Sequence, residues 1–255
     1  MTPARSICLE TATADVAAPD FWDGVYTRTN YSRELPDEMQ RAIANAVAFF
    51  GDIKGKTVVD VGCGAGATSL ALAQMGAQVI ALDTSEVALA ALRDRCGESG
   101  LSNIGIVRCG ALDIDQIGAC DFVFGSMILH HIEPLEQFAV ALKRTLKSGG
   151  KAFFFENNAA CDLLIWFRSH VVGKFWVPKY GDPHEFPLTS AELRMLGRHF
   201  KLRTDYPSMY FLELIATYLL RGYGEKRFKA IDAWLYRHRI GLKYSYNQNV
   251  YLENA

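Results

Sequence analysis

The stretch VVDVGCGAGATSLALAQMGAQVIALD, Val58–Asp83, is the part of the sequence that decides the fold. A short apolar run leads into three alternate glycines, an Ala- and Leu-rich segment follows, and a second apolar run ends the stretch. This order predicts a strand, a tight turn, a helix and a second strand parallel to the first. Glycines leave the backbone bare, so a ligand can lie directly against it. Such a ligand must also suit two carboxylates, Asp60 and Asp83.

The composition is that of an ordinary globular protein. The chain has 255 residues, of which 50% are hydrophobic and 22% charged, and its formal net charge is −1. This length suits one well-filled domain with an appended subdomain. The charge gives no reason to expect nucleic acid as a partner. Six cysteines form no Cys-x-x-Cys pair, so we expect no metal site, no disulfide framework and a cytoplasmic location. We also expect no secretory signal and no transmembrane segment.

Apolar strands alternate with helical patterns from the start of the opening stretch onward, and one further helix precedes it. Helices are predicted at 36–50, 67–75, 85–97 and 134–147, and strands at 57–61, 78–82, 104–108, 121–125 and 151–156. Buried strands joined by helices form parallel sheets that are covered on both faces, with right-handed crossovers. The sequence therefore predicts a doubly wound, Rossmann-like α/β fold with a mostly parallel, seven-stranded sheet.

The regular alternation ends after Glu156. Helical material at 159–177 is followed by a turn-rich loop, and Thr189 with Glu192 predicts a capping box at the start of a short helix. A strand near 200–206, two helices at 209–220 and 225–239, and a final strand at 249–253 complete the chain. We expect these last two strands to pair antiparallel at the sheet edge, with a helical cap between them. Three regions result: 1–50, an N-terminal lid and helix; 51–157, a ligand-binding core; and 158–255, a substrate cap with the last two strands.

The glycine turn GCGAGA, Gly62–Ala67, fits both the dinucleotide fingerprint G-x-G-x-x-A and the pattern G-x-G-x-G. Asp60 would repel a pyrophosphate at the helix N-terminus but suits a cationic amino group. Asp83 ends the second strand, where a carboxylate can accept both hydroxyls of a ribose. Charge-assisted hydrogen bonds of this kind contribute roughly 1.5–3 kcal/mol each. A ligand with an ammonium group, a ribose and a base is favoured, and a tight turn without any ligand is the alternative.

Four segments resemble successive motifs of class I S-adenosylmethionine-dependent methyltransferases, most closely the UbiE-like small-molecule branch. They are VVDVGCGAGATSLALA, VIALDTS, CDFVFGSMILHHI and LKRTLKSGGKAFFFEN, and they cover about Thr57 to Asn157. The resemblance implies S-adenosyl-L-methionine as cofactor and S-adenosyl-L-homocysteine as product. The residues that it assigns to the cofactor are Asp60, Gly62, Gly64 and Gly66 for the methionine moiety, Asp83 for the ribose, Thr84, Ala111 and Leu112 around the adenine, and Ser126 and Met127 at the fourth strand.

The sequence departs from this family at one position. Many relatives have Gly-Asp-Ala after the third strand, with the aspartate on the adenine amino group, whereas this chain has Gly110 there. Either Asp113 replaces that aspartate, or backbone and packing alone hold the adenine. The fourth strand ends in GSMILHHI rather than in an Asn-Pro-Pro-Tyr-like motif. This argues against methylation of the exocyclic amines of bases or of glutamine.

Three residues are candidates for work on the methyl acceptor. His131 follows the fourth strand, at the edge where open parallel sheets bind ligands, and a neutral imidazole there could take a proton. His184 lies in the polar loop PKYGDPHEFP, and Tyr26 lies in FWDGVYTRTNYSRE, which corresponds to a lid over the cofactor in UbiE-like enzymes. Each has a plainer alternative: a structural histidine, an exposed turn and a helix-packing aromatic.

Large apolar residues are frequent in the predicted cap, where a small core of its own is the plain interpretation. A hydrophobic acceptor pocket or a homodimer surface would use the same residues. The helix at 225–239 combines an apolar face with Lys and Arg residues, so peripheral contact with an anionic membrane or a phosphorylated substrate is an alternative to a solvated basic face.

The sequence thus predicts an S-adenosylmethionine-dependent methyltransferase that acts on a small, partly hydrophobic metabolite by in-line displacement. Oxygen, nitrogen and carbon acceptors stay open. One rival is a catalytically silent S-adenosylmethionine-binding partner or regulatory protein. The other, a nicotinamide-dependent oxidoreductase, is disfavoured by Asp60 and by the end of the fourth strand.

Overall fold

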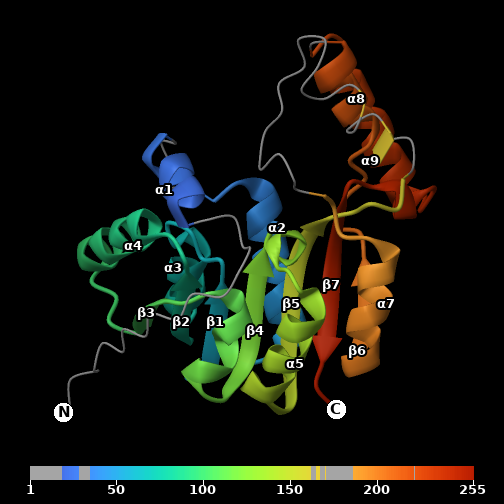
Figure 1. Cartoon of the computed structure of the whole chain (residues 1–255). Helices are drawn as coiled ribbons and strands as arrows, with labels where there is room; N and C mark the ends of the chain where they lie inside the picture. Colours follow the sequence, from blue (N-terminus) through green and yellow to red (C-terminus); the bar gives the residue numbers. More distant parts are fainter. Residues whose placement is uncertain (1–18, 29–34, 162–164, 167–169, 171–185, 221) are drawn as a thin grey trace, which may run out of the picture.

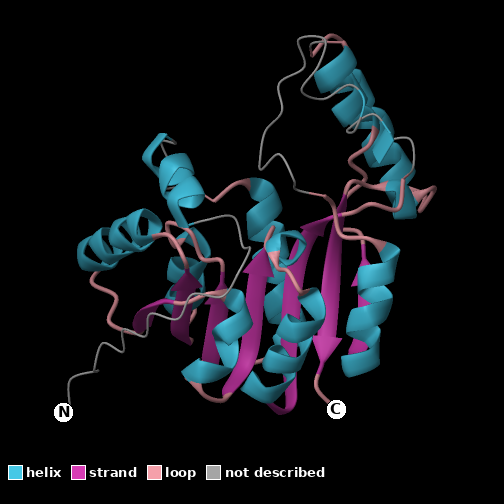
Figure 2. Ribbon diagram, viewed as in Figure 1, coloured by secondary structure: helices cyan, strands magenta, loops and turns pink. Residues whose placement is uncertain are grey.

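The computed structural model describes residues 19–28, 35–161, 165–166, 170, 186–220 and 222–255 (Figure 1). Most of the helix predicted at 159–177 and most of the polar loop that follows lie outside these ranges. The fold of the described residues is a single sheet with helices on both faces (Figure 2).

Seven strands form this sheet, in the order β3-β2-β1-β4-β5-β7-β6. Their bounds are β1 (Thr57–Val61), β2 (Gln78–Asp83), β3 (Ile104–Arg108), β4 (Cys120–Ser126), β5 (Leu146–Asn157), β6 (Lys201–Asp205) and β7 (Asn247–Glu253). The first five strands pair in parallel, and β7 pairs antiparallel with both β5 and β6. The predicted mixed sheet is confirmed. Because β7 inserts beside β5, the outermost strand is β6.

Each face of the sheet has its own apolar core. On one face lie α2 (Asp37–Phe50), α3 (Ala67–Gln74) and α4 (Glu86–Ser99), packed on alternate residues of the strands. The 3-10 helix η1 (Ala111–Ile117) lies on the opposite face with α5 (Leu135–Thr145) and α7 (Ser190–His199). Strands buried on both sides need continuous apolar runs, such as Phe153–Phe155 in β5.

The remaining helices gather beyond the carboxyl ends of the parallel strands (Figure 1). Here α1 (Pro19–Arg28) lies over the β1–β3 side, and α8 (Leu212–Leu219) with α9 (Glu225–Arg237) projects from the β5–β7 side. Two short 3-10 helices, η2 (Leu129–His131) and η3 (Leu242–Tyr244), connect the neighbouring elements. The ligand-binding edge of the sheet is therefore flanked by helices at both ends.

Several predicted helix ends differ from the structure, including the start of α8 at Leu212 and the end of α9 at Arg237. Two further differences have a clear local cause. The helix that begins after Ser85 does not stop at Gly97 but continues to Ser99, because Gly100 adopts the left-handed conformation that ends it (φ 65°). The helix after Pro134 ends at Thr145, since Leu146 already begins β5. The capping box of α7 is confirmed: Thr189 and Glu192 bond each other's backbone N–H groups.

Candidate active site

The turn between β1 and α3 is built from glycines that no other residue could replace without strain. Gly62, Gly64 and Gly66 have φ angles of 69°, 53° and 78°. A Cβ at Gly66 would collide with Leu92, and one at Gly62 would lie 2.8 Å from the Ile128 side chain. These positions favour glycine for two reasons, the positive φ and the close approach of neighbours. The result is a bare backbone at the edge of the sheet.

The carboxylate of Asp83 is tied to this turn. It accepts hydrogen bonds from the Gly64 N–H at 2.8 Å and from the Ser85 N–H at 2.9 Å. Partial burial raises the pKa of Asp83, and these backbone donors oppose the increase. Since each oxygen has a second lone pair, the side chain is held in place and can still accept further donors.

Asp60 lies beneath the same turn in β1 and is almost fully buried. Its described hydrogen-bond donor is the Ser69 hydroxyl at 2.6 Å, from the first turns of α3. Burial raises the pKa of Asp60 to about 7, although the bond from Ser69 lowers it. A buried carboxylate in this state gains when a cation comes close, because the cation offsets the lost hydration.

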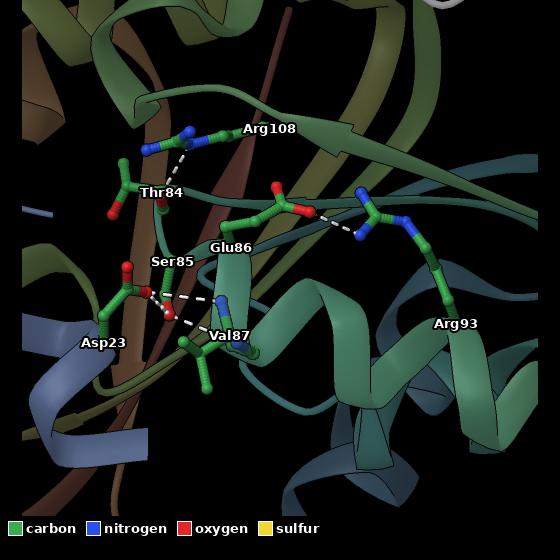
Figure 3. A network of polar contacts seen from close by, with 8 residues as sticks. Asp23, Thr84, Ser85, Glu86, Val87, Arg93 and Arg108 are labelled. Carbon is green, nitrogen blue, oxygen red and sulfur yellow. Dashed lines mark hydrogen bonds and ion pairs between the residues drawn. The ribbon is translucent and has the colours of Figure 1, made fainter. Parts of the chain in front are cut away.

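Helix α1 closes over this site through three contacts. The Asp23 carboxylate accepts hydrogen bonds from the Ser85 hydroxyl and, at 3.3 Å, from the Val87 N–H (Figure 3). The Tyr26 hydroxyl lies where a Cβ of Gly64 would be. The Trp22 ring meets the His131 ring edge to face, with centroids 5.1 Å apart. One helix therefore touches the start of α4, the glycine turn and the segment after β4.

The predicted adenine residues lie beside β2 and β3. The Thr84 carbonyl accepts a hydrogen bond from Arg108 Nε at 3.1 Å (Figure 3), and Ala111 and Leu112 begin η1. One oxygen of the Asp113 carboxylate lies 3.9 Å from where a Cβ of Gly110 would be. The other accepts a hydrogen bond from Gln116 at 3.1 Å. Asp113 is therefore close to the position that an aspartate at 110 would occupy.

The segment after β4 completes the edge. Ser126 ends β4, and Met127 adopts a left-handed φ of 53°, which is unusual for a residue with a side chain. Ile128 then packs over Gly62, and η2 places His131 against Trp22 of α1. Glu156, at the end of β5, hydrogen bonds to this segment at three points.

The structure brings Tyr26, Asp60, Asp83 and His131 to the same edge of the sheet, together with the three glycines. His184 lies outside the described residues. Sequence reasoning missed two residues that organise this edge, Asp23 and Glu156. Glu156 carries a visible signal, because it is a single carboxylate directly after three phenylalanines. Asp23 has no comparable signal.

Two other features of the described ranges bear on what the site can hold. No group of three or more His, Cys, Asp or Glu side chains gathers there in a way that could bind a metal ion. Among the helices of those ranges, none is both long and apolar enough to cross a membrane.

The sheet order, the glycine turn and the carboxylates at the ends of β1 and β2 define the class I methyltransferase fold. These residues fit S-adenosylmethionine, since bare backbone at Gly62 and Gly64 lies beside Asp83 at the end of β2, with Asp60 beneath. Comparison with known proteins agrees. A family model described as a methyltransferase domain matches residues 59–154.

Curated relatives include ubiquinone biosynthesis O-methyltransferases. That of Idiomarina loihiensis is 36% identical over 54% of this chain and 58% of its own length. That of Thiobacillus denitrificans is 31% identical over 60% of this chain and 67% of its own length. The chain thus spans about half to two thirds of the curated relatives that it matches.

Solved structures show the same fold. Magnesium protoporphyrin IX methyltransferase from Synechocystis PCC 6803, solved with bound S-adenosylmethionine, has a TM-score of 0.59 at 17% identity, covering 96% of this chain and all of that one. A SAM-dependent methyltransferase from Archaeoglobus fulgidus has the same TM-score at 15% identity, covering 92% of this chain and all of that one. The chain belongs to the class I S-adenosylmethionine-dependent methyltransferases of the UbiE-like kind.

Proposed function

We propose that this protein transfers the methyl group of S-adenosylmethionine to a hydroxyl oxygen of a small, partly hydrophobic metabolite. The observation that carries the proposal is the joint geometry of the glycine turn, Asp83 and the lid helix α1. These three parts form one cradle, in which the Tyr26 hydroxyl borders Gly64 and the Gly64 N–H fixes Asp83.

The cofactor, when bound, supplies an electrophilic methyl group on a sulfonium. Asp60 would face its ammonium group, and Asp83 its ribose hydroxyls. The rest of its lining would be Gly62, Gly64, Gly66, Thr84, Ser126 and Met127. The adenine would lie beside Ala111 and Leu112. Either Asp113 would bind the adenine amino group, or packing alone would hold the base. Holding donor and acceptor in line can lower the barrier by roughly 7–11 kcal/mol. Trp22 and Tyr26 in α1 would exclude water from the reacting groups.

His131 is our candidate for the base. It follows β4 at the ligand-binding edge and contacts the lid through Trp22. An imidazole at this place can accept the proton that a hydroxyl loses as its oxygen is methylated. The names of the curated relatives, which are O-methyltransferases, support oxygen over nitrogen and carbon.

Binding of S-adenosylhomocysteine tests the cofactor half of the proposal. Calorimetry on the wild type should show one site per chain. In Asp83→Ala the loss of charge-assisted hydrogen bonds, about 1.5–3 kcal/mol each, should weaken binding by at least tenfold. Glu86→Ala is the matched control, because Glu86 is a neighbouring carboxylate that pairs on the surface with Arg93. No binding by the wild type, or equal binding by all three proteins, would overturn the assignment.

Transfer of a labelled methyl group tests the acceptor half. The probes are hydroxylated aromatic acids, primary amines and 1,3-dicarbonyl compounds, which offer oxygen, nitrogen and carbon respectively. Labelled methyl ethers would support the proposal, and N- or C-methyl products would replace the oxygen acceptor. A protein that binds the cofactor but methylates neither these probes nor a metabolite extract would be the catalytically silent alternative.

We further propose that the protein is cytoplasmic and that one of its faces contacts a membrane surface. The five described cysteines are free thiols, which fits a reducing compartment. The outer side of α9 presents Trp234 between Arg227 and Arg237, and Trp234 is 51% exposed. An indole flanked by arginines suits the interface of an anionic membrane, because the ring can enter the headgroup boundary while the guanidinium groups stay at the anionic surface. We therefore propose that this side of α9 binds an anionic membrane rather than a second copy of the chain.

A further inference from the structure

We propose that Glu156 is a positioning residue that holds His131 at the acceptor side of the active site. The inference rests on the proposed role of His131 and concerns how the protein orients this imidazole. Glu156 is the penultimate residue of β5 and directly follows three phenylalanines. Although it is a carboxylate, it is fully buried, as these neighbours are. Burying a carboxylate in such surroundings is costly unless donors surround it.

All the donors described for Glu156 come from one short segment. Its Oε1 accepts the N–H groups of Ile128 at 2.9 Å and Leu129 at 2.8 Å. Its Oε2 lies 2.6 Å from Nδ1 of His130, whose side chain is also buried. A single carboxylate thus fixes three consecutive residues just before His131.

This segment needs such an anchor. It leaves β4 through Met127, whose φ of 53° is strained, and the Met127 N–H is bonded to the Phe155 carbonyl at 2.8 Å. It then crosses the end of β5, with Ile128 packed over Gly62 and Gly125. Glu156 lies below the crossing and supplies acceptors to its backbone.

The position of His131 follows from this anchor. Its N–H donates to the Ile128 carbonyl at 2.9 Å, and its ring lies 4.1 Å from the His130 ring, centroid to centroid. On the other side its ring meets Trp22 of the lid. The imidazole is therefore held between a histidine fixed by Glu156 and an aromatic residue of α1. A carboxylate on Nδ1 of His130 also sets the tautomer of that ring, with the hydrogen on Nδ1.

Glu156→Gln changes this arrangement with almost no change in volume. The amide oxygen can still accept the two backbone N–H groups, but the amide nitrogen then faces His130 and donates to Nδ1. His130 must switch to the tautomer with hydrogen on Nε2, and the ring next to His131 changes its charge distribution. Glu136→Gln is the matched control, since Glu136 is a partly exposed carboxylate that contacts another histidine, His199, at 3.0 Å.

Histidine-ring NMR tests the proposal without an acceptor. Long-range proton–nitrogen spectra, assigned with His130→Gln and His131→Gln, should show His130 protonated on Nδ1 in the wild type and in Glu136→Gln. In Glu156→Gln the His130 tautomer should reverse and the His131 ring signals should shift. An Nε2-protonated His130 in the wild type, or unchanged His131 signals in Glu156→Gln, would overturn the proposal. The wild-type spectrum decides even if Glu156→Gln does not fold.

Kinetics distinguish positioning from mere stability. With an acceptor that the wild type methylates, Glu156→Gln should lower kcat by roughly ten- to a hundred-fold, the size of effect known for groups that orient metal-ligating histidines. KM for S-adenosylmethionine and S-adenosylhomocysteine binding should change little. In a His131→Gln background the same substitution should have almost no further effect on kcat. If the two substitutions instead lower kcat independently, so that their effects multiply in the double variant, Glu156 does not act through His131. If His131→Gln alone keeps full activity, the proposed base is wrong, whatever Glu156 does.

Discussion

At the scale of single residues, Asp60 makes a prediction about pH. Its pKa in the folded protein is about 7, against 3.8 ordinarily, so between these values the folded state holds a proton that the unfolded chain has lost. Stability of the ligand-free protein should then fall as pH rises, by about 1.4 kcal/mol per pH unit, and level off above about pH 7. Asp60→Asn has no such titration and should lack this slope.

Urea unfolding between about pH 5 and 8 measures this difference. Asp121→Asn is a suitable control. Although partial burial opposes it, the Thr57 N–H and Lys147 lower the pKa of Asp121 below its usual value, so its titration falls outside this range. Parallel stability curves for wild type and Asp60→Asn would show that Asp60 ionises as readily in the folded protein as in the unfolded chain.

Gly64 makes a second residue-scale prediction. Gly64→Ala introduces both an unfavourable φ and an overlap with the Tyr26 hydroxyl, so it should displace α1 and weaken S-adenosylhomocysteine binding. Gly118→Ala separates these causes, because Gly118 also has a positive φ (88°) but no atom within 4 Å of its added Cβ. We expect a stability loss in both variants, by roughly 1 kcal/mol or more, and lost ligand binding only in Gly64→Ala. Tight binding by Gly64→Ala would argue against this cradle.

Individual residues also show where sequence reasoning ended. Asp60 and Asp83 could be selected as site candidates because parallel strands end at one edge of the sheet, so their positions in the sequence predict their neighbourhood. Glu156 is visible as a lone carboxylate after three phenylalanines, but its partners could not be inferred. They lie 26 to 28 residues earlier and meet Glu156 only where the Ile128–His130 segment reaches the end of β5. Local periodicity holds no information about such a crossing.

At the scale of elements, the Asp23 carboxylate links α1 to α4. Asp23 supplies acceptors to Ser85 and Val87 at the first turn of α4, where N–H groups have no partner within the helix (Figure 3). Asp23→Ala should therefore destabilise both the docking of α1 and the start of α4, by about 0.5–2 kcal/mol, the usual value of a lost helix cap.

Hydrogen exchange of the backbone amides in α1 and at Val87 measures this loss. Exchange should be faster in Asp23→Ala and unchanged in Glu86→Ala, whose carboxylate contacts only Arg93 among the residues drawn in Figure 3. If the amides of α1 exchange equally in both variants, other contacts hold the lid. The structural basis for the prediction is a contact between residues 62 positions apart, which is why local sequence patterns could not predict how α1 is attached.

The order of the elements was far easier to predict than their ends. Buried strands are marked by apolar runs, and α2 and α5 by apolar residues at helical spacing. Gly97 and Gly100, in contrast, offer the same residue type as a helix end three positions apart. Only the left-handed conformation, which Gly100 adopts, distinguishes them. The 3-10 helix η1 was not predicted either, because its seven residues show no periodic pattern.

At the scale of the whole molecule, positive charge is concentrated in α9, η3 and the residues that connect them; together with α8 these elements form an arm. Residues 222–246 contain six Lys or Arg but only two acidic residues, in a chain whose formal net charge is −1. One of those acids, Asp232, is buried and accepts the N–H groups of Phe211, Leu212 and Glu213, so it caps α8 rather than neutralising the surface. The arm stands beyond the sheet (Figure 1), where its outer face can meet a flat surface without hindrance from the core.

This distribution predicts salt-sensitive binding to anionic lipid. The protein should sediment with vesicles of phosphatidylglycerol and phosphatidylcholine but not with phosphatidylcholine alone. Since each cation near such a surface contributes about 1 kcal/mol, Arg227→Gln with Arg237→Gln should weaken binding by about tenfold or more. Trp234→Ala should weaken it through lost apolar contact, even at high salt. Arg144 is an exposed arginine of α5, and Arg144→Gln should bind like the wild type.

Equal binding to both kinds of vesicle would contradict the prediction. If light scattering shows a dimer that Trp234→Ala dissociates, this face binds a second copy of the chain instead.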